Sequence, residues 1–110
     1  MIVMKHAETI PEQIKEGVVR RVAHLNNLMI VLVDLDDGPK DEIDPPHSHP
    51  HEQVTYVAKG EVLFVMGEQR SKLGPGDVFA VPSGEPHSIQ QLTKHVRLVD
   101  CFTPIREDFI

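Results

Sequence analysis

Histidines stand at alternate positions in the segment from Pro45 to Gln53, which reads PPHSHPHEQ. Side chains two positions apart in an extended chain point to the same side, so His47 and His49 would offer two imidazoles to one ion. Imidazole nitrogen is a common ligand of zinc and other first-row metals. The segment therefore predicts two ligands of a metal site. The alternative is a polar turn with solvated histidines.

The preferred third ligand in this segment is Gln53, which has the same parity as the two histidines. Pro50 interrupts the extended pattern between them. Because of this interruption, parity does not settle whether His51 faces the same way, and a shift of one residue along the strand would turn Glu52 inward. These two residues therefore remain alternatives to Gln53.

A second segment, from Gly76 to His87, starts with a glycine turn and ends in a proline–glycine corner followed by a histidine. Together the two segments resemble the two motifs of the cupin superfamily. The motifs read His47-x-His49-x3-Gln53-x6-Gly60 and Gly76-x5-Pro82-x-Gly84-x2-His87, with fifteen residues between Gly60 and Gly76. Three positions depart from the family pattern: the leading glycine is displaced to Gly38, the usual glutamate is Gln53, and the usual asparagine is Gln91.

This resemblance implies an all-β fold, a small single-domain cupin with a double-stranded antiparallel jelly-roll β-barrel. It also implies that four side chains hold one divalent transition metal inside the barrel. Zinc, nickel, iron and manganese all accept imidazole-rich sites, so the metal is not identified. The alternative is a degenerate barrel whose histidines only form hydrogen bonds. The implied ligands are His47, His49, Gln53 and His87.

An aspartate near the C-terminus is expected to face the barrel interior. Asp100 has the same strand parity as Leu98 and Phe102, so it lies inward if they do. A buried carboxylate is costly unless it is paired or used, and burial raises its pKa towards neutral pH. The alternative is an aspartate that caps backbone N–H groups at the barrel mouth. Arg106 could fold back to grip a substrate carboxylate, or pair with a neighbouring acid at the surface.

The C-terminal run DCFTPIREDF, with the first histidine segment, is similar to pectin-degradation cupins of the KdgF type. The similarity extends from Val18 to the last residue. Such cupins convert 4,5-unsaturated monouronates, released by pectate and alginate lyases, into linear ketonised deoxy-keto-uronates. The resemblance implies a metal-dependent, isomerase-type enzyme in which Asp100 and Arg106 are catalytic, Arg106 holds the substrate carboxylate, and Phe102 lines the sugar site. The alternatives are another metal-dependent cupin enzyme, such as an oxygenase, and a non-catalytic barrel that binds sugar acids.

Short β-branched runs separated by glycine, proline and asparagine turns surround these residues and predict the strands that position them. The region 9–17 carries a possible capping box and a terminal glycine, which predict a short helical turn. We expect one domain over 1–110, with the barrel at about 18–103. The runs expected to form strands are 18–23, 27–34, 54–57, 61–66, 78–81 and 96–102.

The overall charge argues against polyanionic partners. With 17 acidic and 11 basic residues the net charge is −6, which repels nucleic acid and anionic membranes. The one cysteine, Cys101, allows no internal disulfide, and the N-terminal residues carry no signal-peptide pattern, so we expect a cytoplasmic protein. Exposed barrel edges and the cupin resemblance favour a homodimer. We expect no function for His6, His24 and His95.

Overall fold

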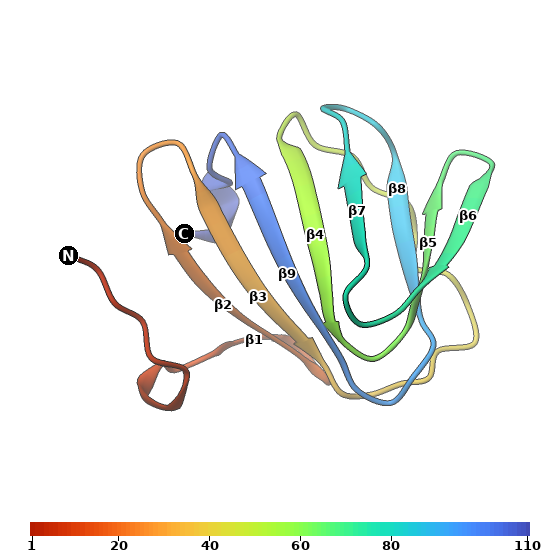
Figure 1. Ribbon diagram of the computed structural model, residues 1–110, viewed down its shortest axis with the longest axis horizontal. Coiled ribbons are helices and arrows are strands. Elements are labelled where there is room, and N and C mark those ends of the chain that lie inside the picture. Colours follow the sequence, from red (N-terminus) through yellow and green to blue (C-terminus); the bar gives the residue numbers. More distant parts are fainter.

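Two antiparallel sheets face each other in the computed structural model, which describes residues 1–110 (Figure 1). The larger sheet has the order β1-β2-β3-β9-β4-β7 and the smaller has the order β6-β5-β8. The strands of the larger sheet are β1 (Glu12–Lys15), β2 (Val18–His24), β3 (Met29–Leu35), β9 (Val96–Thr103), β4 (Glu52–Lys59) and β7 (Val78–Val81). The smaller sheet consists of β5 (Val62–Met66), β6 (Gln69–Leu73) and β8 (His87–Gln91). This is the all-β cupin architecture that the sequence predicts.

Alternating burial along β4 shows how the larger sheet divides its two faces. Gln53, Thr55 and Val57 are buried, whereas Val54 and Tyr56 are exposed. Successive side chains of a strand point to opposite faces, so the buried set faces the smaller sheet. The polar residues Gln53 and Thr55 therefore lie inside the molecule, next to the apolar core.

The core consists of two small apolar clusters between the sheets. One cluster joins both sheets and contains Val57, Val62, Val96 and Leu98. The other lies under the larger sheet and contains Met29, Val31 and Phe102, with Phe109 packed against it. The first cluster packs the two sheets together, and the buried polar residues Gln53 and Thr55 lie in the interior beside the apolar core.

The outer face of the larger sheet has an uncharged surface across four strands. The register aligns two rows of outward-pointing residues over β7, β4, β9 and β3, and we call these rows the outer apolar face. Charged residues start in the next part of the sheet, where Asp34 pairs with Arg97 and Arg21. The rows are Ala80–Val54–Cys101–Ile30 and Val78–Tyr56–Val99–Leu32.

The helical turn predicted for 9–17 is wrong, because this region forms strand β1 and the turn into β2. Gly17 has a φ of 77° and reverses the chain, after which Arg20 pairs with Glu12 across the hairpin. The Thr9 hydroxyl donates to the Lys5 carbonyl, next to the 3-10 turn η1 (His6–Glu8). Pairing with β2 therefore overrides the local helix signals.

The six predicted strands are confirmed, but the structure has three further strands that were not predicted. These are β1, β6 and β8, which contain mostly polar residues. A second 3-10 turn, η2 (Glu107–Phe109), ends the chain. Neither helical turn is long or apolar enough to span a bilayer.

Candidate metal centre

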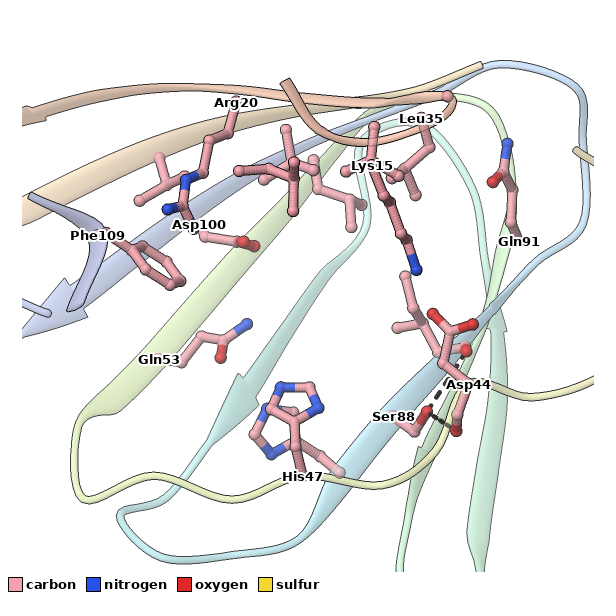
Figure 2. Close-up of a pocket in the computed structure, with 18 of the residues that line it drawn as sticks. Lys15, Arg20, Leu35, Asp44, His47, Gln53, Ser88, Gln91, Asp100 and Phe109 are labelled. Atoms are coloured by element: carbon pink, nitrogen blue, oxygen red, sulfur yellow. Dashed lines mark hydrogen bonds between the residues drawn. The ribbon is translucent and has the colours of Figure 1, made fainter. Parts of the chain in front are cut away.

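Three histidines from two distant segments, His47, His49 and His87, meet between the sheets. Figure 2 shows where His47 lies relative to Gln53 and Ser88. The backbones of His47 and His87 pair with each other, each N–H donating to the other carbonyl at 3.0 and 2.9 Å. His49 lies two residues further on, so its ring joins the pair. One ring nitrogen from each residue lies within 4.8 Å of the other two. The arrangement can therefore hold one metal ion.

Hydrogen bonds to carbonyl groups fix the tautomers of two of these rings. His49 Nδ1 lies 3.0 Å from the His51 carbonyl oxygen, and His87 Nδ1 lies 2.8 Å from that of Glu85. A carbonyl only accepts, so each Nδ1 carries a hydrogen and each Nε2 of a neutral ring has a free lone pair. His87 Nε2 is buried with no hydrogen-bond partner. A bare buried nitrogen of this kind fits a metal ligand.

Partial burial lowers the pKa of His47, and the neighbouring His87 and His49 lower it further. Burial lowers the pKa of His87 in the same way. Metal binding requires the deprotonated imidazole. Both pKa shifts therefore favour the neutral imidazole that a metal ion requires.

Gln53 extends the histidine cluster from strand β4. Its Oε1 lies 3.0 Å from His49 Nε2, and its Nε2 donates to the Thr55 hydroxyl at 2.9 Å. The alternatives are placed differently: Glu52 is exposed, and the His51 ring packs near Phe102 with the centroids 6.5 Å apart. The structure therefore brings Gln53 to the three histidines and leaves Glu52 outside.

Asp100 lies on β9 opposite Thr55 of β4, with its side chain turned into the same interior. The Thr55 hydroxyl donates to Asp100 Oδ1 at 2.6 Å, and Oδ2 makes no hydrogen bond within the protein. Burial raises the pKa of Asp100 to about 6, against the opposing effects of the Thr55 hydrogen bond and the Arg106 charge. The carboxyl group can therefore gain or lose a proton near neutral pH.

Two arginines hold the aromatic ring of Phe109 beside Asp100. The guanidinium carbons of Arg20 and Arg106 each lie 4.0 Å from the centroid of this ring, and Figure 2 shows Arg20, Phe109 and Asp100 together. Arg106 also donates to Asp108 at 2.9 Å, which is the surface pairing considered from the sequence. Since Arg106 also lines the cavity, this ion pair orients a guanidinium that faces the interior.

A cavity of about 300 Å³ joins the histidines, Asp100 and the arginine pair. Its wall mixes apolar side chains of the larger sheet with polar groups, as is typical of small-molecule sites. Its lining includes every residue of the expected site except His49: His47, Gln53, His87, Asp100, Phe102 and Arg106.

Sequence reasoning missed three contributors to this site. Arg20 has the same parity as Val18 and Val22, which is a signal that it faces inward. The same parity argument from Gln53 would have found Thr55. Phe109 lies beyond the last strand, where periodicity gives no information. His6, His24 and His95 are exposed and lie outside the cavity.

Comparison with known proteins gives the family. The family model for the cupin domain matches residues 35–102. The chain belongs to the cupin family. This cupin is 32% identical to the pectin degradation protein KdgF of Dickeya dadantii, over 94% of this chain and 93% of that protein.

Two solved cupin structures superpose on nearly the whole chain. KdgF from Halomonas sp. has a TM-score of 0.87 at 30% identity, covering 96% of this chain and 97% of that one. An RmlC-like cupin from Shewanella frigidimarina also has a TM-score of 0.87, at 32% identity, covering 97% of this chain and 94% of that one. The resemblance to KdgF-type cupins that the sequence predicts is confirmed.

Proposed function

We propose that this cupin converts 4,5-unsaturated monouronates, the products of pectin and alginate lyases, into linear ketonised deoxy-keto-uronates. The observation that carries the proposal is the position of Asp100, which has a free Oδ2 and lines one cavity with His47, His87 and Arg106. Similarity to KdgF, a pectin degradation protein, supports this class of substrate. The reaction is an isomerisation, so it needs no oxidant or reductant.

His47, His49 and His87, with Gln53 as the fourth ligand, would hold one divalent metal, for which zinc, nickel, iron and manganese are candidates. When bound, the ion would supply Lewis-acid stabilisation of negative charge on substrate oxygen. All four side chains are neutral as ligands, so they would leave the positive charge of the ion uncompensated.

The carboxylate of the substrate would be bound by Arg106. A guanidinium offers two parallel N–H groups to a carboxylate, and the ring of Phe109 together with Asp108 already orients this one. Phe102 would provide an apolar wall for the sugar ring, since its ring lies 5.3 Å from the Arg106 guanidinium carbon. The cavity volume, about 300 Å³, is at the lower end of the range for small-molecule sites.

Asp100 would be the group that moves the proton. Opening of the hemiacetal breaks the bond between C1 and the ring oxygen, which leaves an aldehyde at C1 and an enol at C5. Collapse of the enol to a ketone requires a new C–H bond at C4. Asp100 would deliver this proton from Oδ2 to C4 and take one back from the enol hydroxyl at C5, because its pKa of about 6 allows both states near neutral pH.

The test is an assay of enoate absorbance on freshly prepared unsaturated monouronate. Metal-loaded protein is expected to accelerate the loss of absorbance above the spontaneous rate, without oxygen uptake, and chelated protein is not. Oxygen consumption would instead indicate an oxygenase, and stabilisation by the uronate without product would indicate a binding protein. Either result would reject the proposal.

We also propose that this cupin acts in the cytoplasm as a homodimer that pairs through the outer apolar face. Two rows of four uncharged residues each run across four strands there, and Tyr56 and Val78 are 46% and 54% exposed. A twofold axis places the same surface on both sides of an interface. On an uncharged surface no like charges meet across such an axis. A second copy of this chain is therefore the occupant that we propose.

A further inference from the structure

Thr55 lies between the metal centre and the proposed proton donor. It is fully buried in the middle of β4, two residues after Gln53 and directly opposite Asp100 of β9. Its hydroxyl accepts a hydrogen bond from Gln53 Nε2 at 2.9 Å and donates one to Asp100 Oδ1 at 2.6 Å. One oxygen atom therefore connects a residue at the histidine cluster to the carboxylate.

The Thr55 hydroxyl has a single hydrogen, and this determines which group donates and which accepts in each of its two hydrogen bonds. An ionised Asp100 only accepts, so the Thr55 hydrogen must point to it. The hydroxyl oxygen can then only accept from Gln53, which must present its NH₂ group to Thr55. The amide oxygen of Gln53 is consequently turned to His49, at 3.0 Å from Nε2. With the amide reversed, two oxygens would meet with no hydrogen between them.

The same hydrogen bond also selects one oxygen of Asp100. Oδ1 is occupied by Thr55, whereas Oδ2 has no partner within the protein. The carboxyl group lines the cavity, so the free oxygen is the one available to a substrate. A carboxylate without this anchor would be able to rotate and offer either oxygen.

We propose that Thr55 is a positioning residue whose hydroxyl turns the Gln53 oxygen to the histidines and leaves Oδ2 of Asp100 free for the substrate. The Asp100 part rests on the proposed function, whereas the Gln53 part requires only that the histidine cluster binds a metal. Neither effect needs contact between Thr55 and the substrate. Thr55 would therefore act through its two partners.

Three variants separate this role from a general loss of a buried hydroxyl. Thr55→Val keeps the shape and removes both hydrogen bonds, and Thr55→Ser keeps the hydroxyl. Thr93→Val is the matched control, because the Thr93 hydroxyl also accepts one bond, from the Glu61 N–H, and donates one, to the His95 carbonyl. Thr93 lies in a turn outside the cavity.

The first measurement is zinc binding to the metal-free proteins by titration calorimetry. Loss of a residue that orients a metal ligand weakens affinity by about 10–100-fold. We expect the zinc Kd of Thr55→Val to rise by at least about tenfold, and those of Thr55→Ser and Thr93→Val to stay within about threefold of the wild type. An unchanged Kd in Thr55→Val would overturn the role in orienting Gln53.

The second measurement is turnover of unsaturated monouronate at saturating metal. We expect kcat of Thr55→Val to fall by about tenfold or more while KM changes less than about threefold, because Arg106 is untouched. Thr55→Ser should restore kcat. Equal loss of kcat in Thr55→Ser, or none in Thr55→Val, would overturn the role at Asp100. If the wild type has no turnover, the proposed function fails and zinc binding alone decides the role of Thr55.

Discussion

His49 Nε2 and Gln53 Oε1 face each other at 3.0 Å, although neither atom carries a hydrogen when the His49 ring is neutral. The His49 hydrogen is on Nδ1, where the His51 carbonyl accepts it. The Gln53 hydrogens are on the amide nitrogen that donates to Thr55. Two lone pairs at this distance repel, unless a proton or a metal ion lies between or beside them. The protein is therefore organised for a cation at this place.

Adding a divalent metal to the chelated protein is expected to stabilise the fold. A ligand that binds only the native state at one hundred times its Kd contributes about 2.7 kcal/mol. In a domain of this size that corresponds to a rise in Tm of roughly 10 °C, which thermal unfolding with and without zinc or nickel measures. His87→Ala should lose most of this rise, because it removes a ligand. His95→Ala, an exposed histidine outside the cavity, is the matched control. A rise of equal size in His87→Ala would contradict the site.

Arg106→Ala is expected to raise KM with a smaller effect on kcat. A hydrogen bond to a charged group contributes about 1.5–3 kcal/mol, which corresponds to a rise of about 10–150-fold in KM for the uronate. Arg106→Lys should recover only part of the loss, because an ammonium group cannot form the two parallel bonds of the guanidinium. Steady-state kinetics with all three proteins measures this. A fall in kcat at unchanged KM would contradict this prediction and would show that Arg106 interacts with the transition state and not with the bound substrate.

Sequence reasoning identified residues that belong to short motifs, in which the residues lie only a few positions apart along the chain. His47, His49 and Gln53 lie within seven positions, and the motif spacing identified them although the two histidines lie before strand β4 begins. Asp100 was also found by parity, from its apolar neighbours. The fold class follows from the alternation of short β-branched runs with turns, and this needs no long-range information.

The pairing of distant strands was outside the reach of those rules. Thr55 is an ordinary β-former in an apolar run, and its partner Asp100 lies 45 residues away. Only the register of β4 with β9 brings them opposite each other. Strand β1 was predicted as a helical turn because its pairing with β2 is equally invisible to local signals. Arg20 meets Phe109 only through the packing of the C-terminal turn.

A charge placed on the outer apolar face is expected to break the homodimer. Tyr56→Glu puts a carboxylate in the middle of the face, and a twofold axis would bring two of them together in a surface that loses water. The measurement is the molar mass in solution by light scattering. Gln69→Glu, which adds the same charge on exposed strand β6 of the other sheet, should remain a dimer. A wild-type monomer, or a dimer in Tyr56→Glu with unchanged affinity, would reject the interface.

Asp100→Asn is expected to abolish turnover while stabilising the metal-free protein above neutral pH. The pKa of Asp100 rises from 3.8 to about 6 on folding, so ionising this group costs more in the folded than in the unfolded protein. The difference lowers the free energy of unfolding by about 3 kcal/mol. The protonated carboxyl group therefore makes its full contribution to the free energy of unfolding of the wild type below about pH 4, and this contribution is lost as the pH rises through about 6. Asparagine does not titrate, so the advantage of the variant should grow by up to about 3 kcal/mol between about pH 4 and pH 8. Urea unfolding of both chelated proteins across this range measures it, and subtracting the two curves cancels the titration of the histidines. A constant difference between the curves would show that Asp100 keeps its ordinary pKa, and this would remove the physical basis for its role in proton transfer.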